Sequence, residues 1–192
     1  MVKIYDNPQS MYKSFSDRKM GVILTIGNFD GVHLGHQEIL SLVARDASEN
    51  GLVSLAYTFR EHPRSLLRRE DVPTIVNQDE KYHLIEQQGI EVVIARNFWE
   101  ILHLSWQEFW ETEFAFVNVK KLIVGFDFHF GRNAAGHIPE LQSLGKLYGF
   151  EVLVHQPVRL NNEKVSSSAI RKAILSGNVE KATQFLGRHY KL

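Results

Sequence analysis

The run Val22-Ile-Leu-Thr-Ile-Gly27 continues into Asn28-Phe-Asp-Gly-Val-His33-Leu-Gly-His36, and Gln37-Glu-Ile-Leu40 follows. The first run is apolar and has the length of a strand, the second is a glycine-rich turn, and the third opens a helical pattern. A strand that turns directly into a helix creates an anion site, because the free N–H groups and the positive dipole end of the helix favour a phosphate. Glycines in the turn let the backbone approach that ligand closely.

Two histidines stand where the helix should begin. His33 and His36 are three residues apart, so both rings lie on one face of the first helical turn and can address one phosphate. The imidazoles add donors that can be charged near neutral pH. An isolated pair at this spacing is more often surface decoration or a metal site, but the preceding strand and turn favour the phosphate. A Walker-type loop is excluded, because no Gly-Lys-Ser/Thr follows the glycines.

Composition narrows the class of protein. The 192 residues fit one domain with a sizeable core. Lys plus Arg (22) equals Asp plus Glu (22), and this balance argues against a nucleic-acid or anionic-membrane binder. The absence of cysteine excludes disulfides, thiolate catalysis and Cys-based zinc sites. Neither a signal peptide nor an apolar run of about 20 residues is present, so we expect a cytoplasmic protein. The sequence carries no signal for an oligomeric state.

Strands alternate with helices along the chain. The predicted strands are 22–27, 52–59, 91–95, 121–125 and 150–154. The predicted helices are 33–50, 78–88, 105–117 and 138–148, followed by two short terminal helices at 166–176 and 179–186; residues 8–20 read as a polar lead-in. Because the strands are continuous apolar runs, we predict an α/β fold with about five parallel strands, buried on both faces by helices.

Three loops follow strand ends, at residues 27–36, 58–63 and 125–136. Ligands of such folds bind outside the carboxyl ends of the strands. We therefore expect these loops to converge on one cleft.

The loops also carry a family resemblance. Residues 27–36 resemble the His-x-Gly-His motif of the nucleotidylyltransferase superfamily, and their longer form resembles one branch, the bacterial FAD synthetases (FMN adenylyltransferases). Three further segments agree, namely Thr58-Phe-Arg-Glu-His-Pro63, Gly125-Phe-Asp-Phe-His-Phe-Gly131 and Val165-Ser-Ser-Ser-Ala-Ile-Arg171. The resemblance covers essentially the whole chain. It implies a Rossmann-like nucleotidylyltransferase fold over residues 1–192, with small C-terminal helices, and transfer of AMP from ATP to FMN to give FAD and pyrophosphate.

The resemblance also implies roles for individual residues. The catalytic set is His33, His36, Ser167, Ser168 and Arg171. The ATP-binding set is Gly27, Asn28, Phe29, Asp30, Gly31, His33, Gly35, His36, Ser166 and Arg171. The flavin-binding set is Phe59, His62, Pro63, Asp127, Phe130 and Gly131. Mg²⁺ would enter through the ATP phosphates, and no side-chain metal site is expected.

Several of these roles have a plainer alternative. Phe130 can stack on the isoalloxazine ring or simply pack in the core, and Asp127 can be a turn residue. Arg171 can be a solvated helix residue. The aromatic residues Trp99, Trp106, Phe109 and Trp110 favour helix and core packing over a flavin site. The basic residues Arg64, Arg68 and Arg69 form either a solvated loop or a surface that steers polyanionic substrates.

The chain departs from the family at two places. Glu61 replaces the first proline of the family's Phe-x-Pro-His-Pro loop, which should loosen that loop, and its carboxylate can repel the FMN phosphate. Residues 186–190 resemble the boundary after which most members continue into a riboflavin kinase domain, so we expect no kinase domain in this chain: it is a stand-alone adenylyltransferase or a piece cut at the boundary. Two other functions stay open: adenylyl or cytidylyl transfer to another phosphomonoester, and non-catalytic binding of a nucleotide or flavin.

Overall fold

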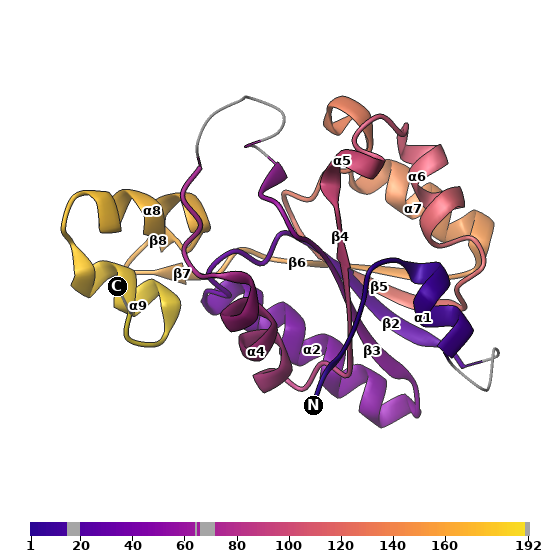
Figure 1. Cartoon of the computed structure of the whole chain (residues 1–192), viewed down its shortest axis with the longest axis horizontal. Helices are drawn as coiled ribbons and strands as arrows, with labels where there is room; N and C mark the ends of the chain where they lie inside the picture. The colour runs from indigo at the N-terminus through magenta and orange to yellow at the C-terminus, as the bar shows by residue number, and fades with distance from the viewer. Residues whose placement is uncertain (15–19, 64, 66–71, 191–192) are drawn as a thin grey trace.

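A six-stranded parallel sheet forms the centre of the protein (Figure 1). The computed structural model describes residues 1–14, 20–63, 65 and 72–190. The strands are β1 (Lys3–Tyr5), β2 (Val22–Ile26), β3 (Val53–Phe59), β4 (Val92–Arg96), β5 (Val119–Gly125) and β6 (Glu151–His155), in the order β1-β4-β3-β2-β5-β6. The central strand β2 is buried at every residue, as its continuous apolar sequence predicts.

Helices cover both faces of the sheet. The helices of one face are α1 (Pro8–Ser14), α5 (Phe98–Ile101), α6 (Trp106–Glu113) and α7 (Ile138–Tyr148), and those of the other are α2 (Leu34–Asn50) and α4 (Gln78–Gln87). Alternate residues of β2 point to opposite faces of the sheet. Leu24 packs in the core beneath α6 and α7, and Ile23 packs in the core beneath α2 and α4. This alternation follows from the two-residue period of a strand.

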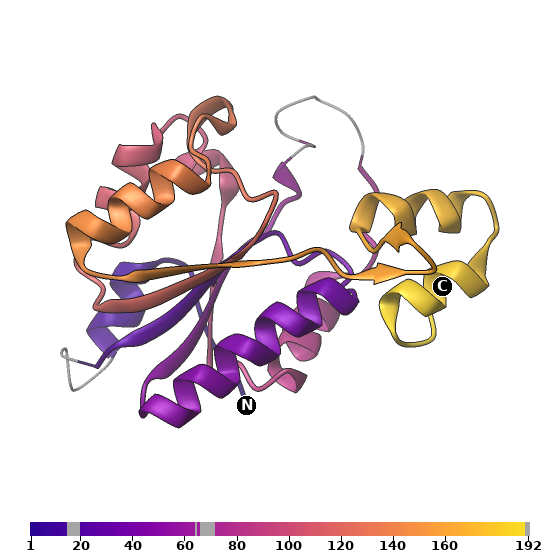
Figure 2. The same ribbon diagram turned by 180° about the vertical axis from the view of Figure 1, so that it is seen from behind.

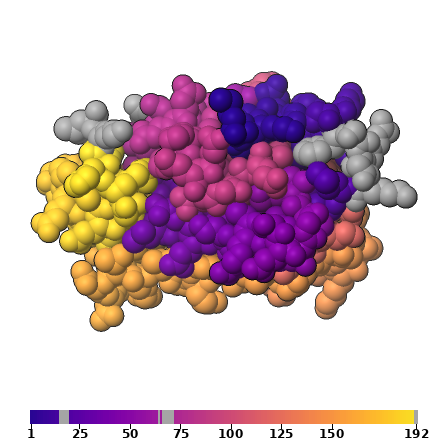
Figure 3. Space-filling model, turned by 90° about the horizontal axis from the view of Figure 1, so that it is seen from below, coloured from indigo at the N-terminus to yellow at the C-terminus, as the bar shows by residue number. Residues whose placement is uncertain are grey.

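A small C-terminal unit packs against the carboxyl edge of the sheet. It consists of the hairpin β7 (Arg159–Leu160) and β8 (Glu163–Lys164), then α8 (Ser167–Leu175) and α9 (Val179–Leu186). Its apolar core includes Ile75 from the segment before α4. Figure 2 shows this unit beside the first turn of α2, and Figure 3 shows its yellow surface against the purple and magenta surface of residues that precede it in the chain. The end of the chain thus lies where the strand-to-helix turn after β2 opens.

Most predicted elements are confirmed, with ends shifted by a few residues. Gly51 and Gly149 end α2 and α7 in the left-handed conformation, at φ 64° and 78°, because glycine meets no steric penalty there. Ser105 caps α6 through a reciprocal capping box with Glu108. That helix ends at Glu113, four residues earlier than predicted. No helix among the described residues is long and apolar enough to cross a lipid bilayer.

Some predictions are wrong. The polar lead-in contains α1, which buries Met11. The prediction of about five parallel strands holds, and residues 3–5 add a sixth strand at the edge, on β4. Phe109 and Trp110 are buried as predicted, but Trp99 is 58% exposed and does not pack in the core. The basic residues Arg64, Arg68 and Arg69 lie outside the described residues.

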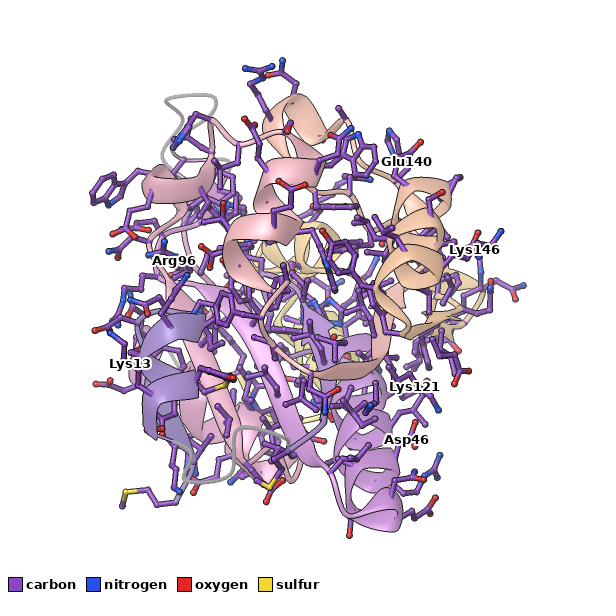
Figure 4. The ribbon with its side chains drawn as sticks, turned by 90° about the vertical axis from the view of Figure 1, so that its right-hand side faces the viewer. Lys13, Asp46, Arg96, Lys121, Glu140 and Lys146 are labelled. Carbon is purple, nitrogen blue, oxygen red and sulfur yellow. The ribbon has the colours of Figure 1, made fainter. Side chains whose placement is uncertain are left out.

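A buried carboxylate joins α6 to the sheet. Glu113 is fully buried and accepts a hydrogen bond of 2.9 Å from the hydroxyl of Tyr57 on β3. It also pairs with Arg96 at the end of β4, which is labelled in Figure 4. Because a buried charge without a partner is strongly destabilising, this network fixes α6 beside the carboxyl ends of β3 and β4.

Candidate active site

The turn after β2 is held in an unusual backbone conformation. Phe29, Gly31 and Val32 have φ values of 50°, 80° and 36°. A positive φ is strained in a β-branched residue such as Val32, and residues of this kind cost on the order of 1–3 kcal/mol. Phe29 and Val32 are both buried, so packing on every side opposes relaxation. A turn of this kind persists only where its surroundings hold it.

Hydrogen bonds from the end of the chain stabilise this turn. Nη2 of Arg188 donates a hydrogen bond of 2.7 Å to the carbonyl of Gly31, and Nη1 donates one of 3.2 Å to the carbonyl of Val32. Nε2 of Gln37 donates to the carbonyls of Val32 and Leu186, each at 2.8 Å. These contacts join residues far apart in the chain and have no local signal in the sequence, where Arg188 reads only as part of the family's domain boundary.

His33 and His36 lie together at the N-terminus of α2. His33 is the N-cap residue, and its Nδ1 accepts a hydrogen bond of 3.4 Å from the backbone N–H of His36. The two rings stack with centroids 3.7 Å apart. A neutral imidazole that accepts at Nδ1 carries its proton on Nε2, so His33 retains an N–H donor. Among the described residues, Nδ1 of His36 is buried without a hydrogen-bond partner; such atoms are rare, and a catalytic role is one reason for which they persist.

Both histidines are neutral at pH 7 in this structure. Burial lowers the pKa of His33 to about 4, and burial together with the neighbouring His33 lowers the pKa of His36 well below its ordinary value. The expectation that these rings are charged near neutral pH is therefore wrong for the protein without a ligand. The physical reason is desolvation, which disfavours the cationic form. The rings therefore present neutral hydrogen-bonding groups at the start of α2.

Asp30 joins the turn to the far end of the chain. Its carboxylate accepts hydrogen bonds from Arg171 on α8 and from the N–H of Ile75, the latter at 3.0 Å. Arg171 also donates from Nε to the carbonyl of Pro73 at 2.9 Å. The side chains of Asp30 and Arg171 are 6% and 11% exposed, so the structure brings these two predicted site residues together as a buried ion pair.

The serines before α8 have separate roles. The hydroxyl of Ser166 accepts a hydrogen bond from the N–H of Ala169 and caps the helix, and Ser167 donates to the carbonyl of Asp30 at 2.9 Å. Ser168 is exposed. Of the three predicted serines, Ser168 is therefore the one whose side chain faces solvent, while Ser166 and Ser167 support the backbone around it.

Asp30 also lines a cavity of about 280 Å³. Its lining includes Asn28, Asp30, Arg60, His62, Gln78 and Lys81. The first two loops predicted to converge therefore do so. The carbonyl of Asn28 is fixed by the buried hydroxyl of Thr58, at 3.1 Å. Lys81 was not predicted as a site residue, although its position four residues before the buried Ile85 places it on the apolar face of α4.

Comparison with known proteins agrees with this geometry. Residues 16–169 match the FAD synthetase family. The chain belongs to that family. It is 34% identical over 177 residues to the bifunctional riboflavin kinase/FMN adenylyltransferase of Haemophilus influenzae, covering 90% of this chain and 57% of the relative. The protein of the same description from Bacillus subtilis is 34% identical over 175 residues, covering 88% of this chain and 54% of the relative. The chain thus spans little more than half the length of these relatives.

Solved structures extend the comparison. A crystal structure described as a macrolide-efflux protein from Streptococcus pneumoniae superposes with a TM-score of 0.79 at 28% identity, covering 97% of this chain and 60% of that one. Pantoate-beta-alanine ligase from Francisella tularensis superposes with a TM-score of 0.53 at 11% identity, covering 97% of this chain and 85% of that one. The second likeness shows the fold alone and agrees with the Rossmann-like architecture of an FAD synthetase.

The third loop carries a charge that acts on His33. Asp127 forms an ion pair of 2.6 Å with Lys164, and both charges act on His33, with opposite effects on its pKa. Asp127 of the third loop therefore acts electrostatically on His33, and the convergence of all three loops on one cleft stays a prediction. Because Asp127 is paired with Lys164 and is 57% exposed, its predicted contact with a ligand stays a prediction.

The predicted flavin-binding residues fall into two groups. Phe59 and His62 lie at the carboxyl end of β3, and His62 lines the cavity. Pro63 follows in the same segment, half-buried. Phe130 is 7% exposed and stacks against Phe128, with centroids 5.5 Å apart. This burial favours the alternative of core packing for Phe130.

Gly131 also has a packing reason. A Cβ there would lie 2.6 Å from the backbone nitrogen of Trp106, and the φ of 73° disfavours a side chain. The close approach to Trp106 is enough to explain why a glycine stands at this position of the family motif, without a flavin contact. Phe130 and Gly131 are therefore not brought into the cavity that Asn28, Asp30 and His62 share.

Glu61, the residue that departs from the family, is hydrogen-bonded to the start of α5. Its carboxylate accepts a hydrogen bond of 3.0 Å from the N–H of Phe98 at the start of α5. A carboxylate at a helix N-terminus is favoured there. The hydrogen bond to Phe98 thus opposes the expected loosening of the loop. It also holds the carboxylate of Glu61 at the N-terminus of α5.

Proposed function

We propose that this chain transfers the AMP moiety of ATP to FMN, releasing pyrophosphate and forming FAD. The observation that carries the proposal is the stacked, neutral pair His33–His36 on the first turn of α2, directly after a glycine-rich turn. A helix N-terminus with neutral N–H donors suits the phosphates of ATP. The family membership of residues 16–169 supports FMN as the acceptor.

The chemistry requires little from a base. An oxygen of the FMN phosphate attacks the α-phosphorus of ATP, the new P–O bond forms, and the bond to pyrophosphate breaks with its electron pair leaving on the pyrophosphate. Because the nucleophile is already an anion, no proton has to be removed. Catalysis then depends on positioning and on neutralising charge. The low pKa of His33, about 4, agrees with a donor role and opposes a general-base role.

The proposed ATP side consists of two opposed groups. His33 and His36, with the backbone of Gly35, would contact the phosphates from α2. From α8, Ser168 and Arg171 would contact them from the other side. Arg171 forms an ion pair with Asp30 in this structure. Its guanidinium group would therefore bind phosphate oxygens either in addition to Asp30 or in place of it.

Mg²⁺ would be held mainly by the phosphates themselves. Among the described residues, no group of three or more His, Asp or Glu side chains is arranged to hold a metal ion. The nearby carboxylates of Asp30 and Asp127 are both paired with cations. The ion prefers to keep several waters and to bind substrate phosphates, and it would supply neutralisation of charge on their oxygens. Since ATP is the donor, we propose the cytoplasm as the compartment.

Product analysis tests the proposal. The pure protein is incubated with FMN, ATP and Mg²⁺, and in parallel with riboflavin, ATP and Mg²⁺, and the flavins are resolved by chromatography. We expect FAD from FMN and no FMN from riboflavin. Absence of FAD would refute the proposal. A screen for pyrophosphate release over other phosphomonoesters would then find a different acceptor, and nucleotide binding without any turnover would support a non-catalytic module.

A further inference from the structure

Lys81 is the buried cation that the proposed reaction leaves without a role. It lies on α4 and is 6% exposed. Its Nζ donates a hydrogen bond of 2.6 Å to the carbonyl of Phe59, the last residue of β3. Within the described part of the chain, that carbonyl is its only hydrogen-bond partner, and it forms no ion pair there. An ammonium group has three N–H donors, so two remain for a ligand.

The position of this charge is costly for the folded protein. Burial lowers the pKa of Lys81 to about 8, with a smaller contribution from the charge of Arg60, and the negative charges of Asp30 and Glu61 only partly oppose the shift. A buried charge without an ionic partner is retained for stability in few proteins. A perturbed titratable group in a cleft is more typical of a functional site. The group is still protonated at pH 7 and is available to bind an anion.

The cavity beside Lys81 suits a compact anion. Lys81, Arg60 and His62 belong to its lining, and Asp30 is the one acidic residue there among the described residues. Arg171 pairs with Asp30, and Asp6 pairs with Arg60. This leaves Lys81 as the cation of the lining without an ion pair in the described part of the chain. A volume of about 280 Å³ is enough for a phosphate and the first part of the chain that bears it.

The cavity also lies close to the histidines. The charge of Lys81 is one of the causes that lower the pKa of His36, and Asn28 and Asp30 line the cavity while belonging to the turn that carries both histidines. A phosphate at Lys81 would therefore be a neighbour of a polyphosphate at His33 and His36. This neighbourhood is what an attack of one phosphate on another requires.

We propose that Lys81 binds the phosphate of the acceptor, a phosphomonoester, in the cavity between the Asn28–Asp30 turn and α4. The inference rests on the proposed function, which makes that phosphate the nucleophile. Lys81 would hold it against the α-phosphorus of ATP while Arg60 and His62 surround it. The carbonyl of Phe59 orients the ammonium group and leaves two of its N–H donors for phosphate oxygens.

Comparison of FMN with riboflavin isolates the phosphate, because the two share the ring system and the ribityl chain. Binding of each is titrated by flavin fluorescence, in the presence of a non-hydrolysable ATP analogue, to wild type and to Lys81→Met. We expect wild type to prefer FMN, and Lys81→Met to bind FMN roughly 10- to 100-fold more weakly, the range for losing a charge-assisted hydrogen bond. Riboflavin binding and the affinity for the ATP analogue should stay unchanged.

The matched control is Lys121→Met. Lys121 pairs with Asp46 at 2.6 Å and with Glu151 at 3.3 Å; Figure 4 shows Lys121 and Asp46 beside one another, at the start of β5 and in the later turns of α2. This variant removes one partly buried lysine away from the carboxyl ends of the strands and should leave both flavin affinities unchanged. Lys81→Gln, which keeps an N–H donor but no charge, replaces Lys81→Met if thermal unfolding shows that the methionine variant does not fold.

The outcomes separate this inference from the proposed function. An equal loss of FMN and riboflavin affinity in both Lys81 variants would show that the residue only supports Phe59, and unchanged FMN affinity would show that it binds no phosphate; either result overturns the inference even if FAD is formed. If wild type forms no FAD but the preference for FMN over riboflavin disappears in the Lys81 variants, the phosphate site stands and the proposed function fails.

Discussion

Arg188 and Gly31 are joined by a hydrogen bond of 2.7 Å across 157 positions of the sequence. The same guanidinium reaches the carbonyl of Val32, whose φ of 36° is unfavourable for valine. The last described residues therefore stabilise the conformation of the turn that precedes His33. The geometry of the proposed site at the start of α2 thus depends on contacts from the end of the chain.

Loss of these contacts should loosen the turn. We expect Arg188→Ala to lower the free energy of unfolding by about 1–3 kcal/mol, since the carbonyl of Gly31 loses its side-chain donor and that of Val32 keeps, among the described residues, only Gln37, and to raise the KM for ATP more than that for FMN. Arg159→Ala is the control, because among the described residues Arg159 donates only to the exposed carbonyl of Asn162. Urea denaturation and steady-state kinetics measure both effects. Equal values for Arg188→Ala and wild type would contradict the assigned support.

The histidine pair makes a kinetic prediction. We expect His36→Ala to lower kcat by roughly 10²–10³, the scale for losing one donor that acts in the transition state. His83→Ala removes an exposed histidine of α4, 63% exposed at its side chain, and should leave kcat unchanged. Rates of FAD formation at saturating FMN and ATP provide the measurement. A kcat within a factor of two of wild type in His36→Ala would remove His36 from the proposed site.

Part of this architecture could be predicted from the sequence. The strands of the central sheet are continuous apolar runs such as Val22–Ile26, and Gly51 marks a helix end by the conformation that glycine alone adopts easily. The glycine-rich turn predicts the proposed anion site, because glycine lets the backbone approach a ligand closely. These signals are local, and each depends on a few neighbouring residues.

The features that the sequence does not predict depend on tertiary contacts. The strand Lys3–Tyr5 has three residues and no alternation of its own, and it exists because β4 offers it a paired edge. The burial of Lys81 follows from how α4 packs, and the low pKa of His33 from how tightly the turn is enclosed. Neither quantity can be obtained from residue type or spacing.

The ion pair of Asp30 and Arg171 predicts non-additive stability. Arg171→Ala leaves a buried carboxylate without its cation and should cost about 3 kcal/mol or more. Asp30→Asn in the same chain keeps the acceptor for the N–H of Ile75 and removes the stranded charge. We therefore expect the double variant to be more stable than Arg171→Ala alone. Urea denaturation of wild type, both single variants and the double variant measures this coupling, and strictly additive losses would contradict it.

The last prediction concerns the pH dependence of folding. Burial lowers the pKa of His33 from 6.5 to about 4, and the charges near it are Lys164, Asp127 and Arg188. Between those values the unfolded chain binds a proton that the folded chain does not, so the free energy of unfolding decreases as the pH falls from about 6.5 to about 4. A shift of this size corresponds to roughly 3 kcal/mol for His33 at the lower end of the window.

His33→Asn removes this titration while keeping an acceptor at the cap of α2. We expect the midpoint of urea denaturation to decrease less steeply for this variant than for wild type between pH 7 and pH 4.5. The carboxylates titrate in both proteins, so their contribution cancels in the difference between the two curves. Parallel curves over the whole range would show that His33 is protonated equally in the folded and the unfolded chain, and its role as a neutral donor to phosphate would then be wrong.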